Sequence, residues 1–527
     1  MNKKLCSVVA ILLAVLLLAA CGSPAATPGA DNQPGNATGT EPAPGASLTN
    51  NNVLRISHFA PTMMDPHFGA NLSDDNATRL MFDFLVFIDG NNVPDPRRGL
   101  AESWTHNEDG TVWTFNIRRG VRFHDGKPLT SRDVQFSFDR LRDPEVGSPL
   151  VTVFNNITDI QTPDDYTVVF TLAQVNPDFL NDLFSYQAKI VDADNTDFAT
   201  NWNGTGPFIL ERFVPEDRLV VRRNPDYWLI DDQGRQLPLL DGVEFIFMAD
   251  QNARMEGLRG GQIDFLLDAP AEFAPIMEAD PNITLYRQAS NFHFVIRMRT
   301  DQGPGQDARV RQALKAGTDR SEILMGAIGG LGVTGRDTPI GPIFGDFYLD
   351  VPEPVRNVEL ARELLAQAGF PEGFSLTLYT QQTSPIPAIA TIWREQMAEI
   401  GVDVEIQLVP SEVYWDMWLD VEFGITNWGP RPYPQPHIDL AYITGAAWNE
   451  THWSHPRLDE LAAQAAVETD VAARAQLYHE IQRIFIEEGP IIVPFFRDNL
   501  WATRANVGGF IPPIDMALDL RFFYFKD

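Results

Sequence analysis

Cysteine is almost absent from this sequence of 527 residues. The two cysteines, Cys6 and Cys21, lie close together at the start of the chain. A body that folds after them therefore contains neither an internal disulfide nor a cysteine metal site.

Positive charge is also scarce. Lys and Arg total 40 against 71 Asp and Glu, which gives a formal net charge of −31. Such a surface repels phosphate backbones and anionic lipid headgroups, and this excludes nucleic acid as an expected partner. Part of the excess charge favours cationic solutes, and much of it is ordinary solvated surface.

Catalytic motifs are missing. The sequence has no G-x-S-x-G, no H-E-x-x-H and no phosphate-cradling loop, and no pair of acidic residues stands out as an acid/base couple. Residues 330–335 fit G-x-G-x-x-G, but a helix-like stretch precedes them and Pro339 follows where a helix should begin. That context predicts a flexible glycine loop. We expect no cofactor, and binding in preference to catalysis.

A histidine pair is the one other candidate for metal chemistry. His452 and His455 are three residues apart, but Pro456 disfavours a helix through both, and no third ligand of suitable spacing lies nearby. We therefore expect no metal site.

Long apolar runs are confined to the N-terminus. A basic start, Asn2-Lys3-Lys4, precedes the apolar stretch Val8 to Ala20, which is too short to span a bilayer stably. Leu18-Ala19-Ala20-Cys21 resembles the bacterial lipobox, which implies a signal peptide over 1–20 and a lipid anchor on Cys21. The alternative is an ordinary secretory signal in which the cysteine occurs by chance.

A tether follows the candidate anchor. Residues 21–50 are rich in Gly, Pro, Ala, Asn, Thr and Ser, and they cannot bury enough surface to fold. A flexible segment of this length reaches about 30 Å on average. The body is expected on the extracytoplasmic face of the cytoplasmic membrane, in a periplasmic space or at the cell surface.

The body alternates between two hydrophobic periods. Ile389, Trp393 and Met397 keep helical spacing up to Gly401, and Val402 to Leu408 then alternate with polar residues. Similar evidence predicts a strand at 113–117 and a capped helix from Thr130-Ser131. The length suggests two to four domains, and helix-then-strand units predict mixed α/β lobes.

Residues 427–437, NWGPRPYPQPH, carry four prolines among contact-making side chains. Because proline fixes its own backbone and pushes the preceding residue to extended geometry, we predict an extended ribbon. Such a ribbon presents Trp428, Arg431, Tyr433 and His437 with little entropy loss on binding. The alternative is a surface loop whose aromatic side chains pack against the body.

Three stretches of the body carry long motifs. They are LAESWTHNEDGTVWTFNIRRGVRFHDGKPLTSRDVQFSFDRL (100–141), then GTGPF, NPDYW and GGQIDF between 204 and 265, and VRQAL (310–314) with Asp319-Arg320. Together they resemble family 5 of the extracytoplasmic solute-binding proteins, the oligopeptide-, dipeptide- and nickel-binding group of ABC importers. The similarity extends from about Val53 to the C-terminus.

The resemblance implies a two-lobed α/β fold of the periplasmic-binding-protein type, in its large three-domain variant with a hinge between mixed sheets. By analogy, lobe I covers 51–85, 200–290 and 500–527. The extra domain covers 86–199 and packs on lobe I, and lobe II covers 291–499.

The resemblance also implies a function. A monomeric receptor would close around a peptide or similar polar solute and deliver it to the transmembrane subunits of an ABC permease. Trp428-Gly429 through Tyr433 corresponds to the segment that lines the cleft in the family, and Phe292 completes the set of candidate ligand contacts with Trp428, Arg431, Tyr433 and His437.

One departure leaves the solute open. Pro432 stands where peptide-binding members commonly have an aspartate for the peptide ammonium, and Arg431 brings the opposite charge. The aromatic residues and histidine are also similar to those of nickel-binding members. A metal chelate or an oligosaccharide is therefore an alternative solute, and a cell-surface hydrolase or a sensory protein on this scaffold is an alternative class.

Overall fold

The computed structural model describes residues 52–69, 71–90, 92–513 and 516–526, which belong to one compact unit. The predicted signal peptide, the lipid anchor at Cys21 and the tether lie outside the described residues. No helix among the described residues is long and apolar enough to cross a membrane.

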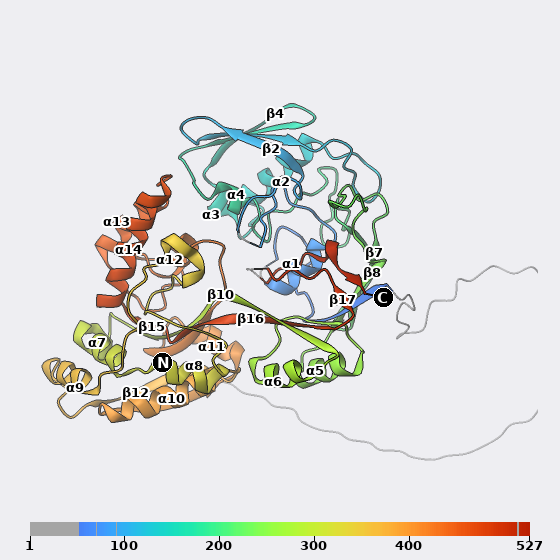
Figure 1. Cartoon of the computed structure of the whole chain (residues 1–527). Helices are drawn as coiled ribbons and strands as arrows, with labels where there is room; N and C mark the ends of the chain where they lie inside the picture. Colours follow the sequence, from blue (N-terminus) through green and yellow to red (C-terminus); the bar gives the residue numbers. More distant parts are fainter. Residues whose placement is uncertain (1–51, 70, 91, 514–515, 527) are drawn as a thin grey trace, which may run out of the picture. The chain divides into compact units, whose positions relative to one another are not determined.

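A mixed sheet of twelve strands runs through the described part of the chain (Figure 1). Its main path is β13 (Val402–Val409), β12 (Phe374–Gln381), β14 (Phe423–Trp428), β10 (Ile283–Met298), β16 (Phe495–Arg504), β9 (Phe265–Leu266), β1 (Val53–His58), β8 (Gly242–Phe247), β7 (Arg218–Arg223) and β6 (Phe208–Val214). β11 (Gly332–Thr334) pairs with β16, and β15 (Ile491–Ile492) pairs with β10.

Two long strands carry this sheet from one side to the other. β10 pairs with β16 from Ile283 opposite Arg504 to His293 opposite Phe496, and it pairs with β14 from His293 to Met298. We call the part around β1, β8 and β9 the β1 side, and the part around β12, β13 and β14 the β14 side. The strands within each of these groups that pair are parallel.

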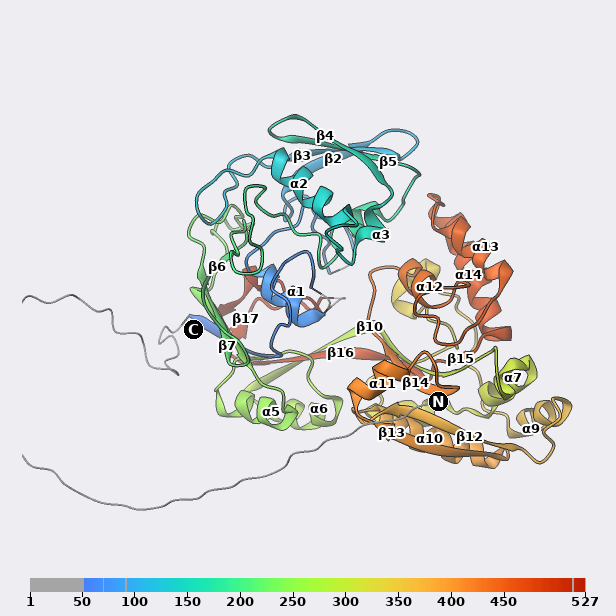
Figure 2. The same ribbon diagram turned by 180° about the vertical axis from the view of Figure 1, so that it is seen from behind.

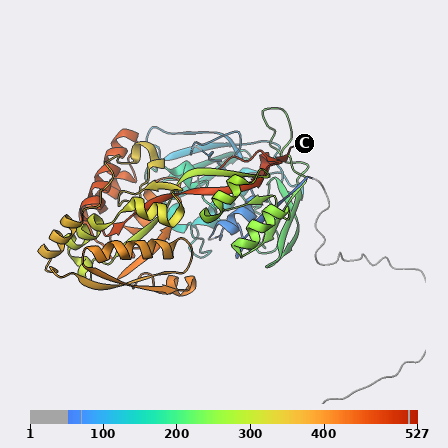
Figure 3. The same cartoon turned by 60° about the horizontal axis from the view of Figure 1, so that its bottom comes forward.

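Helices cover the long sheet on both the β1 side and the β14 side (Figures 1 and 3). The β1 side has α1 (Leu72–Arg79), α5 (Gln251–Gly260) and α6 (Ala274–Ala279). The β14 side has α7 (Ala308–Gly317), α8 (Arg320–Ile328), α9 (Val358–Gln367), α10 (Ile386–Glu399), α11 (Ser411–Met417), α12 (Gln435–Ala441), α13 (Pro456–Ala465) and α14 (Val471–Glu488). A short pair, β17 (Val507–Gly508) and β18 (Tyr524–Phe525), ends the chain.

A separate four-stranded sheet forms what we call the small-sheet region (Figure 2). It contains β2 (Ala101–His106), β3 (Val112–Ile117), β5 (Thr167–Leu172) and β4 (Ile157–Asp164), with α2 (Ser131–Arg142), α3 (Val151–Phe154) and α4 (Phe179–Asp182). Its apolar cluster is drawn from Leu85 to Ile190. The predicted helix start is confirmed: the Thr130 hydroxyl and backbone N–H both donate to Asp133, in a capping box.

The helix-to-strand unit predicted from periodicity is confirmed. α10 ends at Glu399, Gly401 adopts a positive φ of 88°, and β13 begins at Val402. The flexible glycine loop predicted at 330–335 is wrong in part, because Gly332–Thr334 form β11 against β16. These residues are ordered as a strand because their backbone pairs with β16, which is distant in sequence. Local composition does not reveal such pairing.

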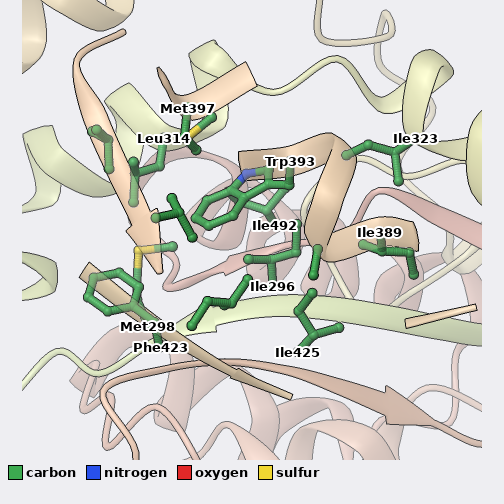
Figure 4. Packing of buried hydrophobic residues seen from close by; sticks show 14 of the residues in the cluster. Ile296, Met298, Leu314, Ile323, Ile389, Trp393, Met397, Phe423, Ile425 and Ile492 are labelled. Carbon is green, nitrogen blue, oxygen red and sulfur yellow. The ribbon is translucent and has the colours of Figure 1, made fainter. Parts of the chain in front are cut away.

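Trp393 lies at the centre of the largest apolar cluster on the β14 side (Figure 4). Its side chain is fully buried among residues of α7, α10 and β14, including Leu314, Met397 and Phe423. The indole N–H donates to the Thr318 hydroxyl at 3.0 Å, so the polar atom is satisfied inside an apolar core.

We expect Trp393→Ala to lower the free energy of unfolding by about 3–5 kcal/mol, because it removes a large buried side chain and leaves a cavity. Trp415, which is 40% exposed on α11, is the matched control, and Trp415→Ala should cost about 1 kcal/mol or less. Urea unfolding followed by circular dichroism measures both. Equal losses in the two variants would contradict the assignment of Trp393 to the core.

Candidate functional site

A cavity of about 260 Å³ lies where the parallel strands of both sides end. Phe59 follows β1 and Asp268 follows β9, and both line it from the β1 side. Gln381 at the end of β12 and Asn427 near the end of β14 line it from the other side. In α/β sheets, ligands bind in the crevice beyond the carboxyl ends of the strands, so the topology marks this cavity as the candidate site.

The long strands supply its floor. Phe292 and Phe294 are two residues apart on β10 and share one face of the sheet. Arg497 on β16 lies opposite Phe292, and its guanidinium carbon is 4.0 Å from the centroid of the Phe292 ring. The register of β10 against β16 shifts between Gln288 and Phe292, an irregularity that re-aims side chains at this point.

Charges of both signs meet at this floor. Arg497 Nη2 lies 3.1 Å from Asp268 Oδ1, whereas its buried Nε has no partner among the described residues. Asp268 adopts a positive φ of 49°, a conformation uncommon outside glycine that concentrates at functional sites. Glu272 and Asp498 add further carboxylates to the lining. The cavity therefore offers partners to both an anionic and a cationic group.

Amides and a helix start form the wall on the β14 side. Gln381 donates through Nε2 to Asn427 Oδ1 at 3.3 Å, and Ser411 donates to Gln381 Oε1 at 3.0 Å. Thr383, Ser384 and Ile386 bring the N-terminus of α10 to the cavity. The partial positive charge of a helix N-terminus favours an anionic group there.

Of the five ligand contacts predicted from the sequence, Phe292 lines this cavity. Trp428 follows Asn427 on β14 and therefore points to the opposite face of the sheet. It is 5% exposed, donates through Nε1 to Glu450 Oε1 at 3.1 Å, and packs against Tyr442. Its surroundings in the structure are those of a core residue, and its role as a ligand contact stays a prediction.

The predicted extended ribbon is wrong over its second half, because α12 begins at Gln435 and includes His437. Proline is well tolerated in the first turn of a helix, where its missing N–H has no partner to lose, so Pro434 and Pro436 start α12. His437 is buried, and its Nε2 is 3.1 Å from the Gly429 carbonyl oxygen. Burial holds the pKa of His437 well below its ordinary value, so the ring is neutral at physiological pH.

Tyr433 contacts the small-sheet region, and Arg431 precedes it by two residues in the chain. Tyr433 donates its hydroxyl hydrogen to Asp182 Oδ1 on α4, at 2.6 Å. Arg431 is half-buried and has no hydrogen-bond or ion-pair partner among the described residues. The neighbouring Pro432 lines a smaller cavity of about 70 Å³, together with Asn92, Phe184 and Pro512.

Sequence reasoning missed Arg497, Asp268 and Gln381. Asp268 and Gln381 each end or follow a strand whose apolar pattern is readable, so position at a strand end was the available signal. Arg497 had no such signal, because its neighbours in space come from β10. No group of three or more His, Cys, Asp or Glu that could hold a metal ion occurs in the part of the chain that the structure describes.

Comparison with known proteins adds independent findings. A family model described as bacterial extracellular solute-binding proteins, family 5 Middle, matches residues 95–451. The glutathione-binding protein GsiB of Escherichia coli strain K12 is 27% identical over 431 residues, which cover 78% of this chain and 82% of that protein.

Solved structures show the same fold. The DppA protein of Helicobacter pylori, in complex with the peptide STSA, has a TM-score of 0.77 and 23% identity, and the match covers 90% of this chain and 98% of that one. NikZ of Campylobacter jejuni, in complex with Ni(L-His), has a TM-score of 0.77 and 18% identity, with coverages of 89% and 98%. The predicted α/β periplasmic-binding-protein fold is confirmed.

We expect Trp428→Phe to lower the free energy of unfolding of the unliganded protein by about 1–3 kcal/mol, because the buried Glu450 carboxylate loses a donor. Trp448, which is 42% exposed beside it, is the control, and Trp448→Phe should change stability little. Chemical unfolding followed by circular dichroism compares the two. Unchanged stability in Trp428→Phe would show that the indole N–H is not needed by the core.

Proposed function

Because the chain belongs to family 5 of the bacterial extracellular solute-binding proteins, we propose that it captures a peptide, or a polar solute of similar size, for an ABC permease. Members of this family bind solutes and do not transform them, so the chain is a binding protein and not an enzyme. Its place of action is extracytoplasmic.

The observation that carries the proposal is the cavity at the strand ends, with Arg497 stacked on Phe292 and paired with Asp268. An incoming carboxylate binds Arg497 and the N-terminus of α10, and an ammonium group binds Asp268 or Glu272. A peptide carries both groups. The cavity is slightly smaller than the roughly 300–1,000 Å³ of ordinary small-molecule sites, which suits a short peptide.

Capture proceeds by closure of two lobes. Lobe I comprises 51–85, 200–290 and 500–527, lobe II comprises 291–499, and the extra domain comprises 86–199. Both boundaries between the lobes fall inside the long strands, one in β10 and one in β16. These strands act as the hinge, and closure follows from contacts that the solute makes with both lobes at once.

The N-terminal segment ties the receptor to the membrane. Acylation of Cys21 anchors the chain, and residues 22–50 let the binding body move between solute capture and the permease. Acyl chains contribute about 0.8 kcal/mol per buried methylene, so two or more chains hold a protein stably at a bilayer.

Calorimetric and thermal-shift screens of reduced glutathione, di- to tetrapeptides, nickel–histidine and oligosaccharides should find a peptide-like solute that stabilises the protein strongly. Arg497→Gln should weaken its binding by about tenfold or more, since a charge-assisted contact is lost. Phe292→Ala should weaken it as well. Arg309, which is paired with Asp307 away from the cavity, provides the control Arg309→Gln with unchanged affinity.

A solute that binds wild type, Arg497→Gln and Phe292→Ala equally well would place the binding site elsewhere. Preferential binding of nickel–histidine or an oligosaccharide over every peptide would instead replace the proposed solute class.

Expression of the full chain in a bacterial host tests the anchor. We expect the wild-type protein in the membrane fraction and Cys21→Ser in the soluble extracytoplasmic fraction, because the thiol that would carry the acyl chain is gone. Metabolic labelling with a fatty acid should mark the wild type alone. Cys6→Ser is the control, and membrane association of Cys21→Ser without label would favour an uncleaved signal segment as the anchor.

A further inference from the structure

Side chains of the small-sheet region contact the β14 side at residues that do not line the candidate cavity. Arg474 on α14 pairs with Asp178, and its Nη1 lies 3.0 Å from Asp178 Oδ1 while its Nη2 bonds Oδ2. Tyr433 donates to Asp182 at 2.6 Å. Asn92 donates through Nδ2 to the carbonyl oxygen of Pro432 at 2.8 Å. None of these residues lines the candidate cavity.

The side chain of Arg474 is held in place by other residues of the β14 side. Its Nε donates to the Ala465 carbonyl oxygen at 2.8 Å, and its guanidinium carbon lies 5.7 Å and 5.5 Å from the ring centroids of Phe347 and Tyr478. A cation positioned in this way loses little freedom when it pairs, and bidentate geometry makes the pair strong.

The two aspartates are presented together by one short turn. The backbone N–H of Asp178 donates to Asn176 Oδ1 at 2.9 Å, and Asn176 Nδ2 donates to Asp182 Oδ2 at 2.7 Å. Asn176 thus links the backbone of Asp178, which precedes α4, to the carboxylate of Asp182, the last residue of α4. Tyr433 and Arg474 reach these two aspartates from separate segments of the β14 side.

Water is largely excluded from these contacts. The side chains of Arg474 and Asp178 are 6% and 11% exposed. Burial raises the pKa of Asp182 to about 7, even though Tyr433 and Asn176 both donate to its carboxylate. Each contact joins the extra domain to lobe II, so it exists only while those parts are together. Opening exposes all four side chains to water.

We propose that Asp178 and Asp182 of the extra domain form a clasp with Arg474 and Tyr433 of lobe II, and that this clasp sets the stability of the closed receptor. The extra domain is then part of the closing machinery, and Tyr433 acts on affinity through closure and not by touching the solute. This inference rests on the proposed function, because a clasp alters affinity only in a protein that closes around a solute.

The clasp alters affinity and release together. The clasp stabilises the closed form by the same free energy whichever solute is bound. It therefore changes the affinity for all solutes by one factor and leaves the preference between solutes unchanged. The clasp also slows dissociation of the solute. A permease that binds both lobes could open the receptor by breaking the contacts of the clasp.

Hydrogen–deuterium exchange of the full chain, with and without reduced glutathione, measures closure at residues 176–183 and 430–436. Tyr433→Phe and Asp178→Asn should each speed exchange in both segments by about tenfold or more, since a hydrogen bond to a charged or buried carboxylate is lost. The segments around β13 and α9, which do not line the cavity, should be unchanged. Arg457→Gln, which removes two exposed ion pairs, one with Glu460 and one with Glu480, is the control and should leave both segments as in wild type.

Charge reversal separates a clasp from general destabilisation. Asp178→Arg alone should speed exchange, and adding Arg474→Asp should restore slow exchange, because the ion pair is rebuilt with its ends swapped. Affinities for glutathione and for di- to tetrapeptides should fall by a common factor in Tyr433→Phe. Circular dichroism checks that each variant is folded, and Asp178→Asn replaces any Arg474 variant that is not.

Equal exchange in wild type, Tyr433→Phe and Asp178→Asn would overturn the clasp. Loss of affinity in Tyr433→Phe without faster exchange would also overturn it, and would make Tyr433 a solute contact. A wild-type protein that binds none of the probes, yet shows clasp-dependent exchange, would count against the proposed solute class while supporting the clasp.

Discussion

The antiparallel ladder between β10 and β16 is the constraint on which the rest of the structure depends. It runs from Ile283 opposite Arg504 to His293 opposite Phe496, and β10 continues from there into its pairing with β14. One backbone hydrogen-bond network therefore joins the β1 side to the β14 side. It also places Phe292 and Arg497 between the carboxyl ends of strands from both sides, which is where a solute can contact both at once.

Two kinds of polar contact serve two purposes in this arrangement. At the strand ends, Arg497 is only partly paired, because a buried nitrogen of its guanidinium has no partner within the described part of the chain. At the small-sheet region, Asp178 and Arg474 satisfy each other in a nearly dry, bidentate pair. The unpaired nitrogen of Arg497 is available to the proposed solute. The Asp178–Arg474 pair bonds only within the protein.

Periodicity predicted the local elements well. The helix before Gly401 and the strand after it, and the capped helix from Thr130, could be assigned because neighbouring residues alone carry those signals. The proline-rich segment was predicted less well. Pro434 and Pro436 are compatible with both an extended ribbon and the first turn of a helix, and burial of His437 and Ile438 against the β14 side decided for the helix.

The sequence by itself determined the fold class, the family and the binding role, because long motifs and alternating helix and strand patterns are properties of consecutive residues. Only the tertiary structure decided which side chains face the cavity. Asn427 and Trp428 are adjacent in the chain, yet the pleat of β14 sends them to opposite faces, one to the cavity and one to the core. The partner of Tyr433 is 251 residues away, so no local pattern could have indicated it.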